Sequence, residues 1–188
     1  MTLIFFAAMC LAQWIVPGKM IYDSENTMAS GTLYKFKTAP IDPSDPIRGK
    51  YVTLSFQDNF FHFRDSAEWN RGDQIFVTFT TDSAGFAIAD QVYHNRPESD
   101  SYLETVVEHV DYYGAQHKVW YNLPFDRFYL EESKASKAEE VYRNAQRDSA
   151  QHAYALVSLG PGHAVLQDVV INDRPILDIV NELNGTDE

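Results

Sequence analysis

Residues 48–56 read RGKYVTLSF, and residues 71–79 read RGDQIFVTF. In the first segment an Arg-Gly pair precedes an alternating stretch whose apolar members are Val52, Leu54 and Phe56, and the second segment repeats this apolar set. Alternation with a period of two is typical of a strand with one buried face, and the glycine suits the turn that leads into it. Both segments are therefore predicted to be strands. Internal duplication and chance similarity explain their likeness equally well.

Similar patterns on both sides of these segments predict a mainly β fold. Residues 32–38 alternate strictly, and Gly160-Pro161-Gly162 marks a tight hairpin between two candidate strands. The expected architecture is a small antiparallel β-barrel or sandwich with one interposed amphipathic helix, preceded by an N-terminal hydrophobic helix. The other candidate strands are residues 85–93, 102–110, 117–123, 127–130, 153–159 and 163–172.

Two segments have helical rather than strand spacing. Ser136 and Glu139 stand three residues apart, as in a capping box, which predicts that the interposed helix begins there. Residues 174–183 are predicted to form a short C-terminal helix that ends at Asn184-Gly185. The apolar face expected for the interposed helix consists of Ala138, Val141, Tyr142 and Ala145.

The N-terminal segment is strongly apolar. Residues 3–16 read LIFFAAMCLAQWIV, and continuation through Lys19 to Tyr22 gives about 20 residues, which is enough to span a bilayer if Lys19 reaches the interface. A signal peptide and a buried core helix are the alternatives, but no basic residue precedes the run. The expected organisation is a membrane anchor over 1–22, a connector over 23–31 and a β-rich domain over 32–188.

The expected location is the cell membrane, with a single pass. The lysines that follow the apolar run would keep the β domain in the cytoplasm under the positive-inside rule. An almost cysteine-free, tyrosine-rich β domain is more typical of the periplasmic or outer side, and we expect that side.

Charge and cysteine content exclude several classes of function. The chain has 188 residues and a net charge of −12, which argues against nucleic-acid binding because that requires a basic surface. The lone Cys10 excludes an intramolecular disulfide and a cysteine-cluster metal site. No nucleotide-binding or metalloprotease motif occurs, so we expect no cofactor and no metal.

Residues 49–56 resemble the signature of the GDYXXLXY protein family, with Lys50 and Phe56 in place of the motif Asp and the final Tyr. The proline-spaced residues 38–48 and the aromatic strand 127–132 are similar to other parts of that family, so the resemblance covers nearly the whole chain. It implies a bacterial protein with an N-terminal hydrophobic anchor and a multi-pass membrane partner. Lys50 suits an exposed turn, whereas Gly49 and Leu54 are interpreted as backbone geometry and core packing, so neither is expected to be catalytic.

The candidate binding residues are those of the signature loop. Asp42 and Asp45 stand three residues apart beside Arg48, a set that could bind a cation or orient a substrate, although pairing within an Asp-Pro turn explains it more simply. Lys50 and Tyr51 follow directly and complete the predicted binding set. Gly49, Leu54 and Phe56 form the structural signature.

Other polar or aromatic groups are weaker candidates. His109 and His117 flank an expected hairpin turn, where cross-strand packing is favoured over a two-histidine metal site. Glu131 and Glu132 form a carboxylate pair that an exposed strand end explains. Residues 60–63, Phe-Phe-His-Phe, form an aromatic cluster suited to a loop plug or an exposed patch.

Two functions follow from these patterns. The first is a membrane-anchored, non-enzymatic β domain that binds another membrane protein, which a flat edge strand or an exposed aromatic patch near Phe60 would favour. The alternative is an envelope hydrolase that uses Asp42, Asp45 or Glu131, which requires a deep pocket around those carboxylates. A barrel that encloses an apolar ligand ranks third, because its interior is expected to be filled by aromatic side chains.

Overall fold

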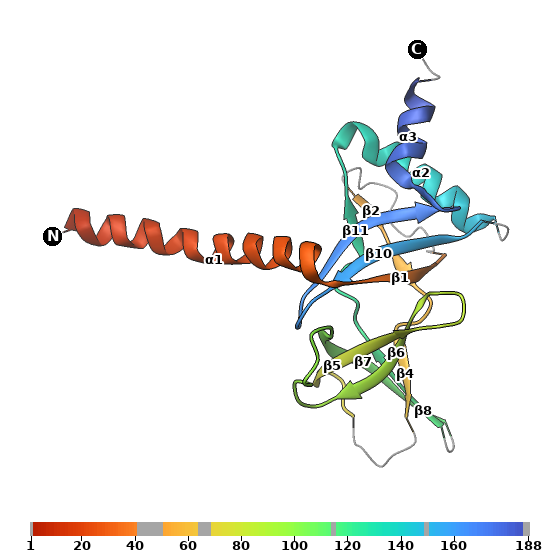
Figure 1. Ribbon diagram of the computed structural model, residues 1–188, viewed down its shortest axis with the longest axis horizontal. Helices are drawn as coiled ribbons and strands as arrows, with labels where there is room; N and C mark the ends of the chain where they lie inside the picture. The colour runs from red at the N-terminus through yellow and green to blue at the C-terminus, as the bar shows by residue number, and fades with distance from the viewer. Residues whose placement is uncertain (1, 41–50, 64–68, 114–115, 149–150, 186–188) are drawn as a thin grey trace.

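The computed structural model describes residues 2–40, 51–63, 69–113, 116–148 and 151–185. A long helix, α1, projects from a β-rich body that contains two further helices (Figure 1). The elements are α1 (Thr2–Ser30), β1 (Thr32–Ala39), β2 (Tyr51–Thr53), β3 (Ser55–Phe56), β4 (Phe60–Phe63), β5 (Gln74–Thr81), β6 (Ala87–Tyr93), β7 (Leu103–Tyr113), β8 (Gln116–Tyr121), β9 (Arg127–Tyr129), α2 (Glu132–Arg147), β10 (Ala153–Leu159), β11 (Ala164–Ile171), β12 (Arg174–Pro175) and α3 (Ile176–Gly185).

One half of the body is a nearly closed, five-stranded antiparallel barrel. Its strand order is β4-β8-β7-β5-β6, and its two edge strands, β4 and β6, approach each other at the seam. The inward set predicted for residues 74–79 is confirmed, because Ile75 and Val77 are fully buried and Phe79 is nearly so; Phe76, on the opposite face, is buried as well. Gly72 has φ +91°, so the turn before β5 uses the conformation that favours glycine. A mainly β fold with a barrel is therefore confirmed.

The other half is a second antiparallel sheet with the order β12-β11-β10-β1-β3, which contacts α2 and α3. The predicted apolar face of α2 is confirmed, with Ala138, Tyr142 and Ala145 buried. The predicted helix start is wrong: α2 begins at Glu132, and Ser136 lies inside it. Ala135 is also buried, so the apolar face extends one turn further toward the N-terminus than the capping box indicated.

The stretch predicted as one strand over 51–56 is split into two. β2 pairs with β9, whereas β3 pairs with β1 in the second sheet. Between them the backbone N–H of Leu54 donates to the carbonyl of Asp126 at 2.7 Å, outside either ladder. The alternation holds, because Val52 and Leu54 are buried, but the chain changes partners at Leu54.

α1 continues without a break through residues 23–30, which therefore belong to the helix. Its C-terminal end packs on β10 and β11, where Thr27 is buried. Across the part of the chain that the structure describes, no helix is long and apolar enough to cross a membrane. This finding does not support the membrane-spanning anchor predicted for residues 1–22.

Candidate functional site

Most of the predicted binding residues precede β2 in the chain. Asp42, Asp45, Arg48, Gly49 and Lys50 fall within residues 41–50, which lie outside the described residues. Their assigned roles stay predictions.

The signature segment pairs with the second segment that carries the family resemblance. β2 and β9 form a two-stranded antiparallel ribbon in which Tyr51 lies opposite Tyr129 and Val52 lies opposite Phe128. Val52 and Phe128 point into the core, whereas Tyr129 is 66% exposed. The Tyr51 and Tyr129 rings lie 5.5 Å apart, and the Arg127 guanidinium lies 5.3 Å from the Tyr51 ring centre. Tyr51 therefore belongs to a surface formed by two aromatic rings and the cationic side chain of Arg127.

The other two described signature residues, Leu54 and Phe56, pack in the hydrophobic core and against it, respectively. Leu54 is 3% exposed, and the Phe56 ring packs against Phe36 and Phe125 with centroid distances of 6.1 and 5.2 Å. Both occupy positions where packing determines the residue type.

The two histidines considered for a metal site do not face each other. In the β7–β8 ladder His109 lies opposite Trp120 and His117 lies opposite Tyr112, so each histidine is three residues away from the position opposite the other. Within the described ranges, no group of three possible metal ligands occurs.

Glu131, the described carboxylate of the hydrolase hypothesis, occupies an open position. Its side chain is 75% exposed before α2, and its Oε2 lies 3.7 Å from Nζ of Lys134. It does not line the pocket described next.

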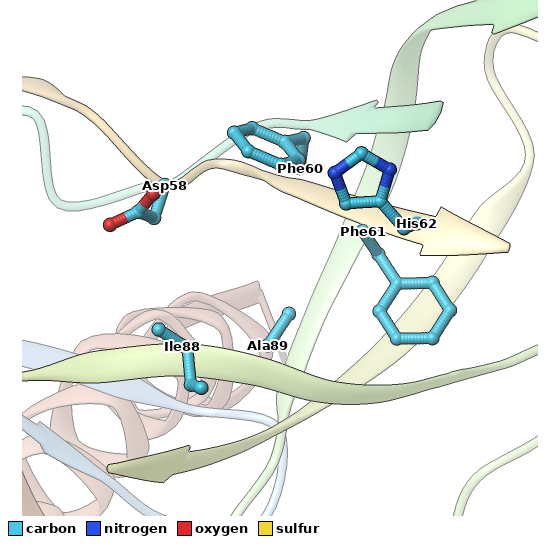
Figure 2. Close-up of a pocket in the computed structure, with 6 residues that line it drawn as sticks. All are labelled: Asp58, Phe60, Phe61, His62, Ile88 and Ala89. Carbon is cyan, nitrogen blue, oxygen red and sulfur yellow. The ribbon is translucent and has the colours of Figure 1, made fainter. Parts of the chain in front are cut away.

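That pocket lies at the barrel seam, between the edge strands β4 and β6 (Figure 2). Its volume is about 280 Å³. Asp58 and Phe60 lie on one side of it, across from Ile88 and Ala89 on the other (Figure 2). The lining residues are Asp58, Phe60, Phe61, His62, Ile88 and Ala89.

Sequence patterns identified only half of this pocket. The aromatic run 60–63 was recognised as a possible exposed patch, and the structure places it in the edge strand β4. Ile88 and Ala89 were missed because nothing in their own segment shows that β6 faces β4 across the seam. The available signal was the number of predicted strands, because a sheet that closes into a barrel brings its two edge strands together.

A polar and aromatic cluster lies beside the pocket on β4, β7 and β8. The indole N–H of Trp120 donates to Oδ2 of Asp111 at 2.8 Å, and Nε2 of His109 lies 2.6 Å from Oδ1 of the same carboxylate. Nζ of Lys118 lies 4.4 Å from the centre of the Phe60 ring. The hydrogen bond from Trp120, followed by the one from His109, holds the pKa of Asp111 below its ordinary value.

We expect Trp120→Phe to raise the pKa of Asp111, because it removes the largest interaction that favours the ionised carboxylate. The sign follows from the lowered pKa: the stabilisation is present above the unfolded-state pKa and is lost as pH falls through the folded-state value. A carboxyl carbon NMR titration measures this shift. Asp82 is the control, since its pKa is lowered by Phe86, Ala84 and Lys37 instead. Identical Asp111 titrations in both proteins would contradict the assignment.

Comparison with known proteins gives one match. The GDYXXLXY protein family matches residues 13–169, which is most of the chain and includes the paired β2 and β9 segments. The searches of curated proteins and of solved structures found no match. The chain belongs to the GDYXXLXY protein family.

Proposed function

We propose that this protein is a non-enzymatic, membrane-attached domain that binds another membrane protein. The attachment is α1, and the interaction surface lies on the β domain. The observation that carries the proposal is the exposure of large apolar side chains on α1, where Trp14, Ile15 and Val16 are 75, 68 and 64% exposed.

The distribution of these side chains favours burial in lipid. At about 100° per residue, three consecutive positions such as Trp14, Ile15 and Val16 point in widely different directions. Phe5 and Tyr22, nearer the ends of the apolar stretch, are also largely exposed. A helix that is apolar on all sides is normally covered by a protein core or by membrane. The proposal requires that lipid covers α1, and it does not require that α1 crosses the bilayer.

The C-terminal end of α1 is held firmly against the domain, which supports a role as an attachment. Thr27 packs on Gly160, where an added Cβ would lie 3.1 Å from the threonine hydroxyl. A Cβ on Gly31 would lie 2.4 Å from the carbonyl oxygen of Thr27, so the helix and β1 join without space for a side chain. The orientation of α1 is thus transmitted directly to the β domain.

Two surfaces of the β domain support a binding role. The aromatic strand β4 is an edge of the barrel, with Phe60 and Phe61 only partly buried, and edge strands are common sites of protein association. Tyr51 and Tyr129 form the second surface, on the ribbon that contains the family signature. Composition favours the periplasmic or outer side for this domain, as inferred above.

Vesicle flotation tests the attachment. We expect the full chain to float with phosphatidylcholine vesicles and the double variant Ile15→Lys/Val16→Lys to lose at least about tenfold in partitioning, since a lysine at the centre of a helix in lipid costs about 2.5 to 3.5 kcal/mol. The control is Ile15→Leu/Val16→Ile, which keeps the apolar surface and should float like the wild type. Wild-type protein that stays in the dense fraction, or lysine variants that float equally well, would contradict the proposal.

A further inference from the structure

We infer that the seam pocket between β4 and β6 binds a segment of a partner protein that places one apolar side chain in the pocket and a neighbouring Lys or Arg beside Asp58. This inference rests on the proposed interaction role of the β domain and names the chemistry that the site recognises.

The pocket is large enough to accept one apolar side chain. Its volume is about 280 Å³, just below the range of about 300 to 1,000 Å³ that is typical of small-molecule sites. A leucine-sized side chain and part of its backbone fit this space.

The walls of the pocket are apolar and incompletely covered. Ile88 is 37% exposed although it is a large apolar residue, and Phe61 is only half-buried. Figure 2 shows Ile88 and Ala89 facing the space below β4. Insertion of an apolar side chain would remove this surface from water, which is favourable in proportion to the area covered.

Asp58 gives the pocket its charge preference. Its side chain is half-buried, and its carboxylate forms no hydrogen bond or ion pair within the described part of the chain. After burial, the charge of Asp58 is the second cause that raises the pKa of the Tyr121 hydroxyl, so the charge acts close to the barrel wall. A basic side chain on the partner would pair with this carboxylate and complement the net charge of −12.

The pocket is bounded by the outer edges of β4 and β6. β4 pairs with β8 on one side, and β6 pairs with β5 on one side, so each strand presents its other edge at the seam. Exposed backbone donors and acceptors of edge strands bind extended peptide segments. Because β4 and β6 already lie close together at the seam, an extended segment would lie along one of these edges, over the pocket, and not between the two strands.

Methyl NMR on the full chain in detergent micelles tests the inference, with the Ile and Ala methyl groups labelled. The probe is the peptide acetyl-Gly-Lys-Leu-Lys-Gly-amide, compared with Gly-Glu-Leu-Glu-Gly and Gly-Lys-Ser-Lys-Gly peptides blocked in the same way. We expect saturable shifts of the Ile88 and Ala89 methyl signals, with the first peptide binding at least about threefold more tightly than either of the others.

Two variants and their matched controls give the site-specific evidence. Asp58→Asn should weaken binding about threefold, and Ala89→Leu, which fills the pocket, about tenfold. Asp100→Asn and Ala84→Leu change exposed positions outside the pocket and should leave binding unchanged. The methyl spectrum reports whether Ala89→Leu folds, and the Asp58→Asn result stands without it.

The result that would overturn the inference is the absence of saturable shifts at Ile88 and Ala89, equal binding of the three peptides, or unchanged binding by Asp58→Asn. Such a result in a protein that still floats with vesicles would reject the peptide site and retain the membrane attachment. Specific peptide binding by a protein that does not float would reject the attachment alone.

Discussion

Replacing Phe36 with alanine is expected to lower the free energy of unfolding by about 3 to 5 kcal/mol, the range for truncation of a buried phenylalanine. Phe36 is 3% exposed and lies on β1 of the second sheet. Its ring centroid lies 5.2 Å from that of Phe79 on barrel strand β5 and 5.0 Å from that of Phe125. Aromatic pairs in this distance range contribute beyond their buried area. Phe36 therefore joins the two halves of the body.

Urea unfolding of the full chain in detergent, followed by circular dichroism, measures this effect. Leu33→Ala is the matched control, because Leu33 lies on the same strand but is 52% exposed, and we expect it to change stability by less than about 1 kcal/mol. Equal effects of the two substitutions would contradict the assignment of Phe36 to a shared core.

Leu54→Ala is expected to destabilise the protein by about 2 to 4 kcal/mol, whereas Thr53→Ala should cost less than about 1 kcal/mol. Leu54 is buried at the point where the chain passes from the β2–β9 ribbon to the second sheet, and truncation leaves a cavity there. Thr53 is the neighbouring residue on β2, and its side chain is exposed. The two residues of this segment thus have different roles, one in the core and one on the surface.

The same urea titration compares the free energies of unfolding of the two variants. If Thr53→Ala were the more destabilising substitution, packing at Leu54 would not explain the residue type found there.

The alternation of apolar residues predicted the strands well where the whole segment belongs to one sheet. Phe36, Ile75 and Val77 are buried as their alternation indicates. Alternation records which face is buried and carries no information about the partner strand, so the change of sheet at Leu54 could not be predicted.

The candidate site could be predicted only in part for a related reason. The aromatic residues around Phe60 were visible as a run, but Ile88 and Asp58 join them only because the barrel closes on itself. The start of α2 was misplaced because Ser136 and Glu139 match a capping pattern that tertiary packing of Ala135 overrides. Contacts distant in sequence decided both outcomes.

Quenching of Trp14 fluorescence by brominated lipid tests the central claim, that lipid covers α1, most directly. Bromine quenches an indole only at short range, and Trp14 is 75% exposed on α1. Trp14→Phe measures the background from Trp69 and Trp120. We predict that vesicles of dibrominated phosphatidylcholine quench the wild-type protein well beyond the Trp14→Phe variant. Equal emission from the wild-type protein in brominated and unbrominated vesicles would contradict the claim.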